Sequence, residues 1–303
     1  MSTRFVISVR QKVELRNGLI FAAPWIVGLL AFYVYPIAAS FYYSFTEYKA
    51  IMPAEWVGLR NYVTLIGKDP LFRLSLYNTI YYVAFEVPLA ILVGICLALA
   101  LNTKVIGTPV YRTIYFLPIL VPSIASAMLW MWILNPQYGL LNSVLYKLGI
   151  NGPGWIADPK WSKPSIILMQ VWGGVGRPII IYLASLQDIP QQLYEAADID
   201  GANVWAKIRW ITLPMITPVI LFNTIMGLIG AFQMFTQPFI MTDGGPANST
   251  LLYTLYLYRN AFRYFKMGYA SAMAWLLFLL IFLLTVLIFQ SSSRWVYYPT
   301  QRR

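Results

Sequence analysis

The sequence predicts an all-α membrane protein, a polytopic bundle of six transmembrane helices that forms a single domain over residues 1–303. Hydrophobic residues make up 59% of the chain and charged residues only 11%, whereas an average soluble domain has about 25% charged residues. Several charge-free stretches are long enough to cross a bilayer, which takes about 20 apolar residues. Turn-forming residues separate these stretches, so the chain is expected to cross the membrane repeatedly.

The expected spans follow from these apolar stretches. The first, 19–42, has too long an apolar core for a cleaved signal peptide and is expected to remain as a helix. The second, 76–101, is interrupted by a single charge, Glu86, which lies beside Pro88 in the outer half of the span. The remaining four spans are expected at residues 111–134, 164–186, 213–240 and 269–290.

The net charge of +11 predicts contact with anionic lipid, because the basic residues flank apolar stretches and form no continuous basic face. For an inside N-terminus the cations divide almost evenly between the two sides of the membrane. The flank of the first span therefore decides the orientation, and its bases outnumber the lone acid Glu14. Both termini are expected in the cytoplasm on the strength of Arg4, Arg10, Lys12 and Arg16.

The composition argues against an enzyme. There is no histidine, the single cysteine, Cys96, lies in an apolar stretch, and no Gly-x-x-x-x-Gly-Lys-Ser/Thr loop is present to bind ATP phosphates. No metal site or nucleophile–base pair is expected. An ion-coupled secondary transporter of small polar solutes is an alternative, although it requires intramembrane acids and Glu86 is the only one.

The inner connection at residues 187–212 is the most unusual segment. Pro190 is suited to begin a helix, and Glu195 and Asp198 are expected in its first turns, where acids interact favourably with the helix dipole. Gly201 predicts either a turn between two short helices or a close backbone approach. A connection between two spans needs no such helix pair, so this segment is interpreted as a docking element for another protein.

The pattern of this segment resembles a known family. Glu195-Ala196-Ala197, Gly201 and Ile211-x-Leu213-Pro214 match the EAA loop of the membrane subunits of binding-protein-dependent ABC importers. The likeness extends from about residue 15 to 294 and is to the importers of maltose, glycerol phosphate and oligosaccharides. The other similar segments are residues 112–118, 172–174, 242–246 and 267–271.

The resemblance implies a type I importer permease with a cytoplasmic coupling helix. It implies that a sugar or oligosaccharide is delivered by an extracytoplasmic binding protein to a path enclosed with a second homologous permease. Two cytoplasmic ATPase subunits would bind ATP and Mg, and this chain would bind no cofactor. The setting would be a bacterial or archaeal plasma membrane. The residues that would couple to the ATPase are Glu195, Ala196, Ala197, Asp198, Gly201, Ile211, Leu213 and Pro214.

The substrate path is predicted from residues within the spans. Arg177 follows three glycines and precedes Pro178, which predicts a broken helix. Arg177 is expected either to bind a hydroxylated or anionic solute or to pair with Glu86, and Glu86 has either a structural role or a substrate contact. Gln233 and Gln237 are expected one helical turn apart. In related permeases the ligand contacts helices on either side of the EAA loop, which indicates Trp172, Gly173, Arg177, Asn223, Gly227, Gln233 and Gln237, unless these residues serve only interhelical packing.

Overall fold

The computed structural model describes residues 9–103 and 107–298, so Arg4 of the basic N-terminal segment lies outside the described part. The chain folds into two compact units. The first contains the chain up to Leu65 together with Asn260–Trp275, and the second contains Ile66–Arg259 together with the chain from Leu276. Each unit is described by itself below.

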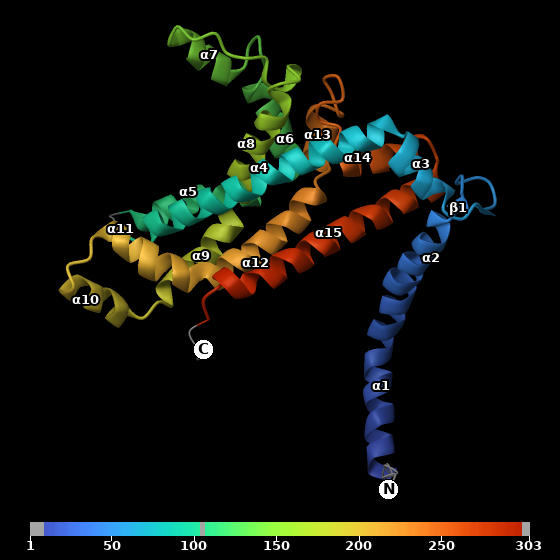
Figure 1. The fold of residues 1–303 in the computed structure, drawn as a ribbon, viewed down its shortest axis with the longest axis horizontal. Helices are drawn as coiled ribbons and strands as arrows, with labels where there is room; N and C mark the ends of the chain where they lie inside the picture. The colour runs from blue at the N-terminus through green and yellow to red at the C-terminus, as the bar shows by residue number, and fades with distance from the viewer. Residues whose placement is uncertain (1–8, 104–106, 299–303) are drawn as a thin grey trace. The chain divides into compact units, whose positions relative to one another are not determined.

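Helices account for most of the described residues (Figure 1). The elements in chain order are α1 Val9–Leu29, η1 Leu30–Val34, α2 Tyr35–Ser44, β1 Thr46–Glu47, β2 Glu55–Trp56, α3 Arg60–Lys68, α4 Pro70–Leu101, α5 Thr108–Leu120, α6 Ser123–Ile133, α7 Leu140–Lys147, η2 Trp155–Ala157, α8 Ser162–Gly174, α9 Gly176–Gln187, α10 Gln191–Ile199, α11 Val204–Lys207, η3 Ile208–Thr212, α12 Leu213–Phe232, α13 Thr236–Met241, α14 Tyr253–Tyr258, η4 Arg259–Arg263 and α15 Met267–Trp295.

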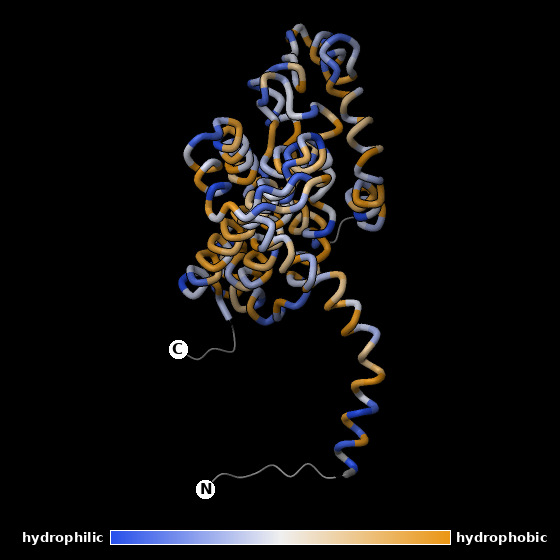
Figure 2. The backbone as a smooth tube through the Cα atoms, turned by 90° about the vertical axis from the view of Figure 1, so that its right-hand side faces the viewer, coloured by the Kyte–Doolittle hydropathy of each residue, from blue (hydrophilic) through white to orange (hydrophobic). Residues whose placement is uncertain are grey.

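The predicted all-helical membrane fold is confirmed. Within the described residues, four helical stretches are long and apolar enough to span a bilayer, and two bent helix pairs raise the number to six if each pair is one span. In Figure 2 the first turns of α1 are largely hydrophilic, and hydrophobic residues prevail farther along that helix. The four continuous stretches are Lys12–Ser44, Pro70–Leu101, Val204–Met241 and Met267–Trp295.

The two bent pairs coincide with the third and fourth expected spans. The helix axis bends by 102° between α5 and α6, and this bend was not predicted from the sequence. Val121 is extended there because the residue before a proline, here Pro122, avoids helical angles. Helices α8 and α9 meet at a 49° bend between Gly174 and Gly176, which confirms the broken helix predicted beside Arg177.

In the first unit, the start of α15 lies against the β1–β2 hairpin. The hairpin pairs Thr46 with Trp56 and Glu47 with Glu55. The Gly268 N–H donates to the Tyr48 carbonyl at 3.1 Å. A Cβ on Gly268 would lie 2.1 Å from the Thr46 carbonyl oxygen, so this close backbone approach requires glycine.

In the second unit, α4, α9 and α12 pack against one another (Figure 1). Gly94 of α4 allows a close approach, since a Cβ there would lie 3.1 Å from the Tyr182 ring of α9. At this junction the fully buried side chains of Ala98, Tyr182 and Ile216 form a core cluster with Leu186 and Ile189. The cluster lies next to the connection that leads into α10.

Helix α4 begins earlier than the expected span 76–101. Asp69 caps the helix by accepting hydrogen bonds from the Leu71 and Phe72 amides at 2.9 and 3.1 Å. Because the helix runs from Pro70 to Leu101, Glu86 lies at its middle. The placement of Glu86 in the outer half of the membrane span stays a prediction, because the helix is longer than the expected span 76–101.

The connection 242–252, between α13 and α14, is held together by its own side chains. The Thr242 and Thr250 hydroxyls lie 2.6 Å apart, and Thr250 donates to the Gly245 carbonyl at 2.8 Å. The Asp243 side chain pairs with Arg259 at 3.5 Å. This connection is also tied to α4, because the fully buried Asn78 donates to the Asn248 and Leu251 carbonyls at 2.9 and 3.2 Å.

Candidate coupling loop and substrate path

The connection predicted as a docking element is a pair of short helices. Pro190 precedes α10 as its N-cap, as expected. Helix α10 has nine residues, and Glu195 is the fifth of them. Asp198 lies in the last turn, where the helix dipole disfavours an acid. The expectation that Asp198 lies in the first turns was therefore wrong, and a cation offsets its charge, since Asp198 pairs with Lys207.

Gly201 makes the turn between the two helices. Its φ is +72°, in the left-handed region. The Ala202 amide donates to the Ala197 carbonyl at 2.9 Å and the Gly201 amide to the Asp198 carbonyl at 3.1 Å, which is the Schellman pattern of a helix C-terminus. Nothing lies within 4 Å of a Cβ placed on Gly201, so of the two alternatives the turn is right and the close backbone approach is wrong.

The second arm of the pair leads directly into α12. The Asn203 side chain accepts from the Ala206 amide at 2.9 Å and so caps α11. The short π-helical segment η3, Ile208–Thr212, then joins α11 to α12. Pro214 is the second residue of α12 and directly follows η3, so its missing amide removes one hydrogen bond from this continuous helical stretch.

The outer face of this helix pair is exposed. Glu195 and Ala196 are exposed on α10, whereas Ala197 is half-buried. Three large apolar side chains accompany them without being covered, Ile199 at 88% exposure, Val204 at 68% and Trp205 at 79%. The arrangement offers an acid beside an apolar surface that no described part of the chain covers.

The inner face of the pair is attached to the helix bundle. Ile211 and Leu213 are half-buried and pack against the core cluster of Ala98, Tyr182, Leu186, Ile189 and Ile216. The motif is thus divided in space, because its Glu and first Ala face outward while its Ile-x-Leu-Pro end is anchored to the spans.

The candidate path residues near the α8–α9 bend are largely exposed. Trp172 lies at the end of α8, and its ring makes an edge contact with Trp130 at 5.6 Å between centroids. Nothing lies within 4 Å of a Cβ on Gly173. Arg177 is exposed near the start of α9.

Arg177 and Glu86 do not form an ion pair. Glu86 is 8% exposed within α4, whereas Arg177 is exposed on α9, and no ion pair joins them among the described residues. The alternative in which the two side chains pair as a buried link is wrong. Either residue remains a candidate for the path on its own.

The path candidates of the fifth span divide between two environments. Asn223 is buried in α12 and donates to its own helix at the Val219 carbonyl, 3.1 Å away. A Cβ on Gly227 would lie 3.6 Å from the Val87 side chain, so Gly227 faces α4. Gln233 is exposed just after α12 and Gln237 lies in α13, because the helix breaks between Phe232 and Thr236. The expected one-turn spacing of the two glutamines was wrong.

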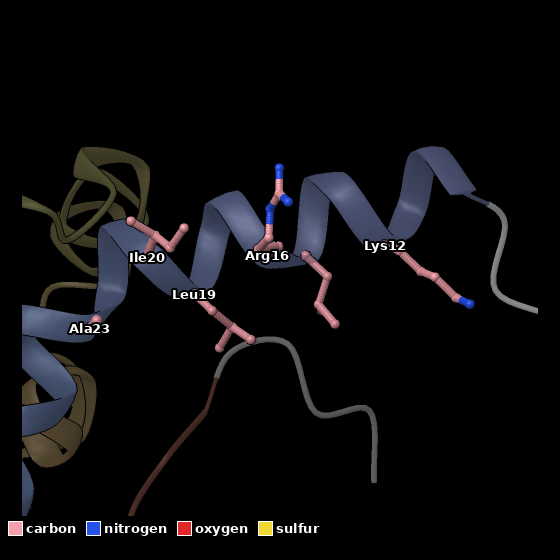
Figure 3. A pocket seen from close by; sticks show the side chains of 6 residues that line it. Lys12, Arg16, Leu19, Ile20 and Ala23 are labelled. Carbon is pink, nitrogen blue, oxygen red and sulfur yellow. The ribbon is translucent and has the colours of Figure 1, made fainter.

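A shallow pocket on α1 offers no alternative site. It lies along one face of α1 and is lined only by residues of that helix (Figure 3). No second described element closes it, so it is an open surface groove. Its lining residues are Lys12, Leu15, Arg16, Leu19, Ile20 and Ala23. Among the described residues, moreover, no group of three His, Cys, Asp or Glu side chains could hold a metal ion.

Several residues that hold this region were not predicted from the sequence. Tyr194 lies 2.9 Å from Thr212 across the coupling loop, hydroxyl to hydroxyl, and Lys207 pairs with Asp198. These contacts join residues of different helices, which no periodic sequence pattern connects. They can therefore be recognised only in the folded structure. The positions of Tyr194 and Thr212 immediately beside the Glu-Ala-Ala and Leu-Pro motifs were the one available signal.

Comparisons with known proteins agree with this geometry. The family described as "Binding-protein-dependent transport system inner membrane component" matches residues 90–296. The chain is 40% identical over 288 residues to the Probable ABC transporter permease protein YesP of Bacillus subtilis (strain 168), covering 94% of this chain and 93% of that protein. It is 36% identical over 282 residues to the Lactose transport system permease protein LacF of Rhizobium radiobacter, covering 91% and 94%.

A solved structure shares the fold. The chain matches one in the crystal structure of a bacterial alginate ABC transporter in complex with an alginate pentasaccharide-bound periplasmic protein. The TM-score is 0.82 at 25% identity, over 93% of this chain and 96% of that one. The chain therefore has the fold of a helical membrane component of an ABC importer.

The chain belongs to the family of binding-protein-dependent transport system inner membrane components. It is therefore a multi-pass permease subunit of a prokaryotic ABC importer, and the resemblance found in the sequence is confirmed. In this family ATP is bound by separate ATPase subunits, and the permease is not itself catalytic. The ion-coupled secondary transporter is excluded.

Proposed function

We propose that this permease imports a sugar or oligosaccharide. The proteins it resembles include a permease named for lactose transport and a transporter solved with an alginate oligosaccharide on its periplasmic protein. In this proposal an extracytoplasmic binding protein delivers the solute to a cavity that this chain and a second homologous permease enclose. The two compact units act as one permease domain. The protein crosses the plasma membrane several times, and both of its termini lie in the cytoplasm.

The path in this proposal is lined by polar and aromatic side chains near the α8–α9 bend and the end of α12. Amides suit sugar hydroxyls because they both donate and accept hydrogen bonds, and aromatic rings suit apolar sugar faces. The exposure of Arg177, Trp172 and Gln233 supports their contact with solute. The remaining candidates are Gly173, Gly227, Gln237, Asn223 and Glu86, of which the last two are the most buried.

The exposed α10–α11 pair is the observation that carries the coupling role. We infer that it docks on one of two cytoplasmic ATPase subunits, with Glu195 meeting a basic side chain and Ile199, Val204 and Trp205 covered by the partner. An acid beside a bare apolar patch fits a protein partner better than solvent. ATP-driven closure of the ATPase pair would then move α10, and alternating access would follow in the spans.

The coupling role predicts that two substitutions weaken ATPase binding. Glu195→Lys reverses the charge at the contact, and Gly201→Val forces a β-branched residue to a φ of +72°. Each is expected to lower the amount of ATPase that copurifies with the tagged chain from its native membranes by about tenfold. The chain itself should still be produced and inserted.

Two matched variants serve as controls. Glu55→Lys makes the same charge change at an exposed position of the β2 strand, and Gly201→Asn keeps a residue type that tolerates positive φ. Both should retain ATPase close to the unsubstituted level. Full copurification with Glu195→Lys and Gly201→Val alike would contradict the coupling role.

A further inference from the structure

Two side chains on one face of α10 bind the segment that joins α11 to α12. The Tyr194 hydroxyl lies 2.9 Å from the Thr212 hydroxyl, and the Asp198 carboxylate pairs with the Lys207 ammonium. Tyr194 and Asp198 are four residues apart, so they lie on the same face of the helix, one turn apart. The two contacts therefore hold α10 at two points on the segment 207–212.

The Thr212 hydroxyl has two hydrogen-bonding neighbours. Its oxygen lies 2.9 Å from the Tyr194 hydroxyl, where either oxygen can donate, and 3.3 Å from the Lys207 carbonyl, which accepts. Thr212 is only 4% exposed, and little water competes for these bonds.

Both contacts converge on an irregular part of the helix. The segment η3 is π-helical, with one extra residue in its turn, and such bulges occur frequently at functional sites. Lys207 contributes to both links, since its side chain binds Asp198 and its carbonyl accepts from Thr212. A displacement of α10 is thus applied at both ends of residues 207–212, immediately before α12.

Tyr194 has a second attachment through its ring. It packs against the core cluster that Ala98 of α4, Tyr182 of α9 and Ile216 of α12 form with their neighbours. One side chain therefore packs against the core cluster while its hydroxyl is bonded to Thr212. No other residue of α10 packs against that cluster in the described part of the chain.

We propose that Tyr194 and Thr212 are positioning residues that make α10 move as one body with the start of α12, with the Asp198–Lys207 pair as the second link. The inference rests on the proposed coupling role of α10. A helix held at a single point pivots about it, whereas two links one turn apart preserve its orientation. Force applied to the exposed face of α10 then reaches the span instead of being lost in rotation of the loop.

The test measures how firmly α10 is held within the purified complex. Cys96 is the single cysteine and is exposed, so a Cys96→Ala background accepts two new cysteines for nitroxide labels. Exposed positions Gln192 on α10 and Met226 on α12 are suitable. Pulsed electron paramagnetic resonance then gives the distribution of distances between the two labels, with and without ATP.

The expected results separate the hydroxyl bond from general packing. Tyr194→Phe and Thr212→Val keep side-chain volume, and each should raise the fraction of label pairs outside the unsubstituted distance range by about fivefold, the weight of one hydrogen bond. Thr212→Ser restores a hydroxyl and should return that fraction to its original value. Thr224→Val is the matched control, because Thr224 bonds only its own helix at the Ile220 carbonyl, 2.7 Å away.

The outcomes distinguish the two proposals. Unchanged distance distributions in both Tyr194→Phe and Thr212→Val would overturn this inference, and so would a failure of Thr212→Ser to rescue. Copurification of the ATPase should be unaffected by all these variants, since they lie away from the exposed face. If the unsubstituted chain copurifies with no ATPase, the coupling role itself fails, while the distances still report on the two links.

Discussion

At the scale of single residues, two glycines of the motif segments are required for different physical reasons. Gly201 needs a left-handed backbone angle, with free space around it. Gly268 needs the absence of a side chain, because the β1 carbonyl lies where a Cβ would be. Gly201 therefore tolerates a larger side chain better than a change of backbone conformation. Gly268 tolerates no added side-chain atom.

Gly268→Ala is accordingly expected to destabilise the protein by about 2 kcal/mol, the range of overpacking substitutions. The atoms in the way belong to the backbone of Thr46, Tyr43 and Tyr48, which cannot rotate aside. Thermal unfolding of the detergent-solubilised chain measures the effect.

The control is Gly67→Ala in α3. No atom lies within 4 Å of a Cβ there, and the substitution should be neutral or stabilise by up to about 1 kcal/mol through helix propensity. Equal melting temperatures for the two alanine variants would show that the approach of α15 to β1 is not tight.

At the scale of elements, the connection before α12 and the connection after α13 differ in how they are held. The connection 242–252 is bonded internally and to α4 through Asn78, which is 1% exposed and also accepts from Lys163 at 3.0 Å. The coupling pair α10–α11 depends on two polar links and one packed ring. The connection 242–252 is therefore expected to move with the helix bundle. The coupling pair α10–α11 is expected to be less firmly held.

Asn78→Ala is expected to release the connection 242–252 from α4. The substitution removes the amide donor of the Asn248 and Leu251 carbonyls and the amide acceptor of the Lys163 ammonium, at a cost of about 1–3 kcal/mol. Hydrogen exchange of residues 248–253 should become faster in the variant. Asn151→Ala, at an exposed turn position, is the control and should leave the exchange unchanged. Identical protection in both variants would show that Asn78 does not hold the connection.

Most helices of this chain were predictable from sequence, and most side-chain pairings were not. Apolar length alone locates α4 and α15, because a bilayer sets a minimum for each span. The 102° bend between α5 and α6 was missed although Pro122 marks it. The Tyr194–Thr212 bond joins residues 18 apart across a turn, and the cap at Asp69 begins α4 at Pro70, earlier than the expected residue 76. Tertiary contacts decide such features, and local patterns do not record them.

At the scale of the whole molecule, ion pairs mark the connections on both sides of α12. The Asp198–Lys207 pair precedes that helix and the Asp243–Arg259 pair follows it. Charge is expensive at membrane depth, which explains why the chain carries so few charged residues and why Glu86 stands out. The proposed orientation of the termini follows from the basic flank of the first span, because the cations otherwise divide almost evenly between the two sides.

The proposed orientation predicts opposite labelling of two exposed positions. In a Cys96→Ala background, Asn151→Cys should react with a membrane-impermeant maleimide in right-side-out vesicles. Gln191→Cys, at the start of α10, should react only after the vesicles are permeabilised. Reaction of Gln191→Cys in sealed vesicles would place the coupling pair outside and overturn both the orientation and the coupling role.

The empty surroundings of Gly201 have a consequence for chemistry at this position. Because a Cβ on Gly201 meets no atom within 4 Å and the left-handed φ is the demanding feature, the position discriminates by handedness. A D-alanine introduced by chemical ligation would adopt this angle without strain, whereas its L-enantiomer, with the same atoms and volume, would not. The turn after α10 thus accepts D-residues and disfavours L-residues at position 201, and substitution with D-residues is the most direct test of it.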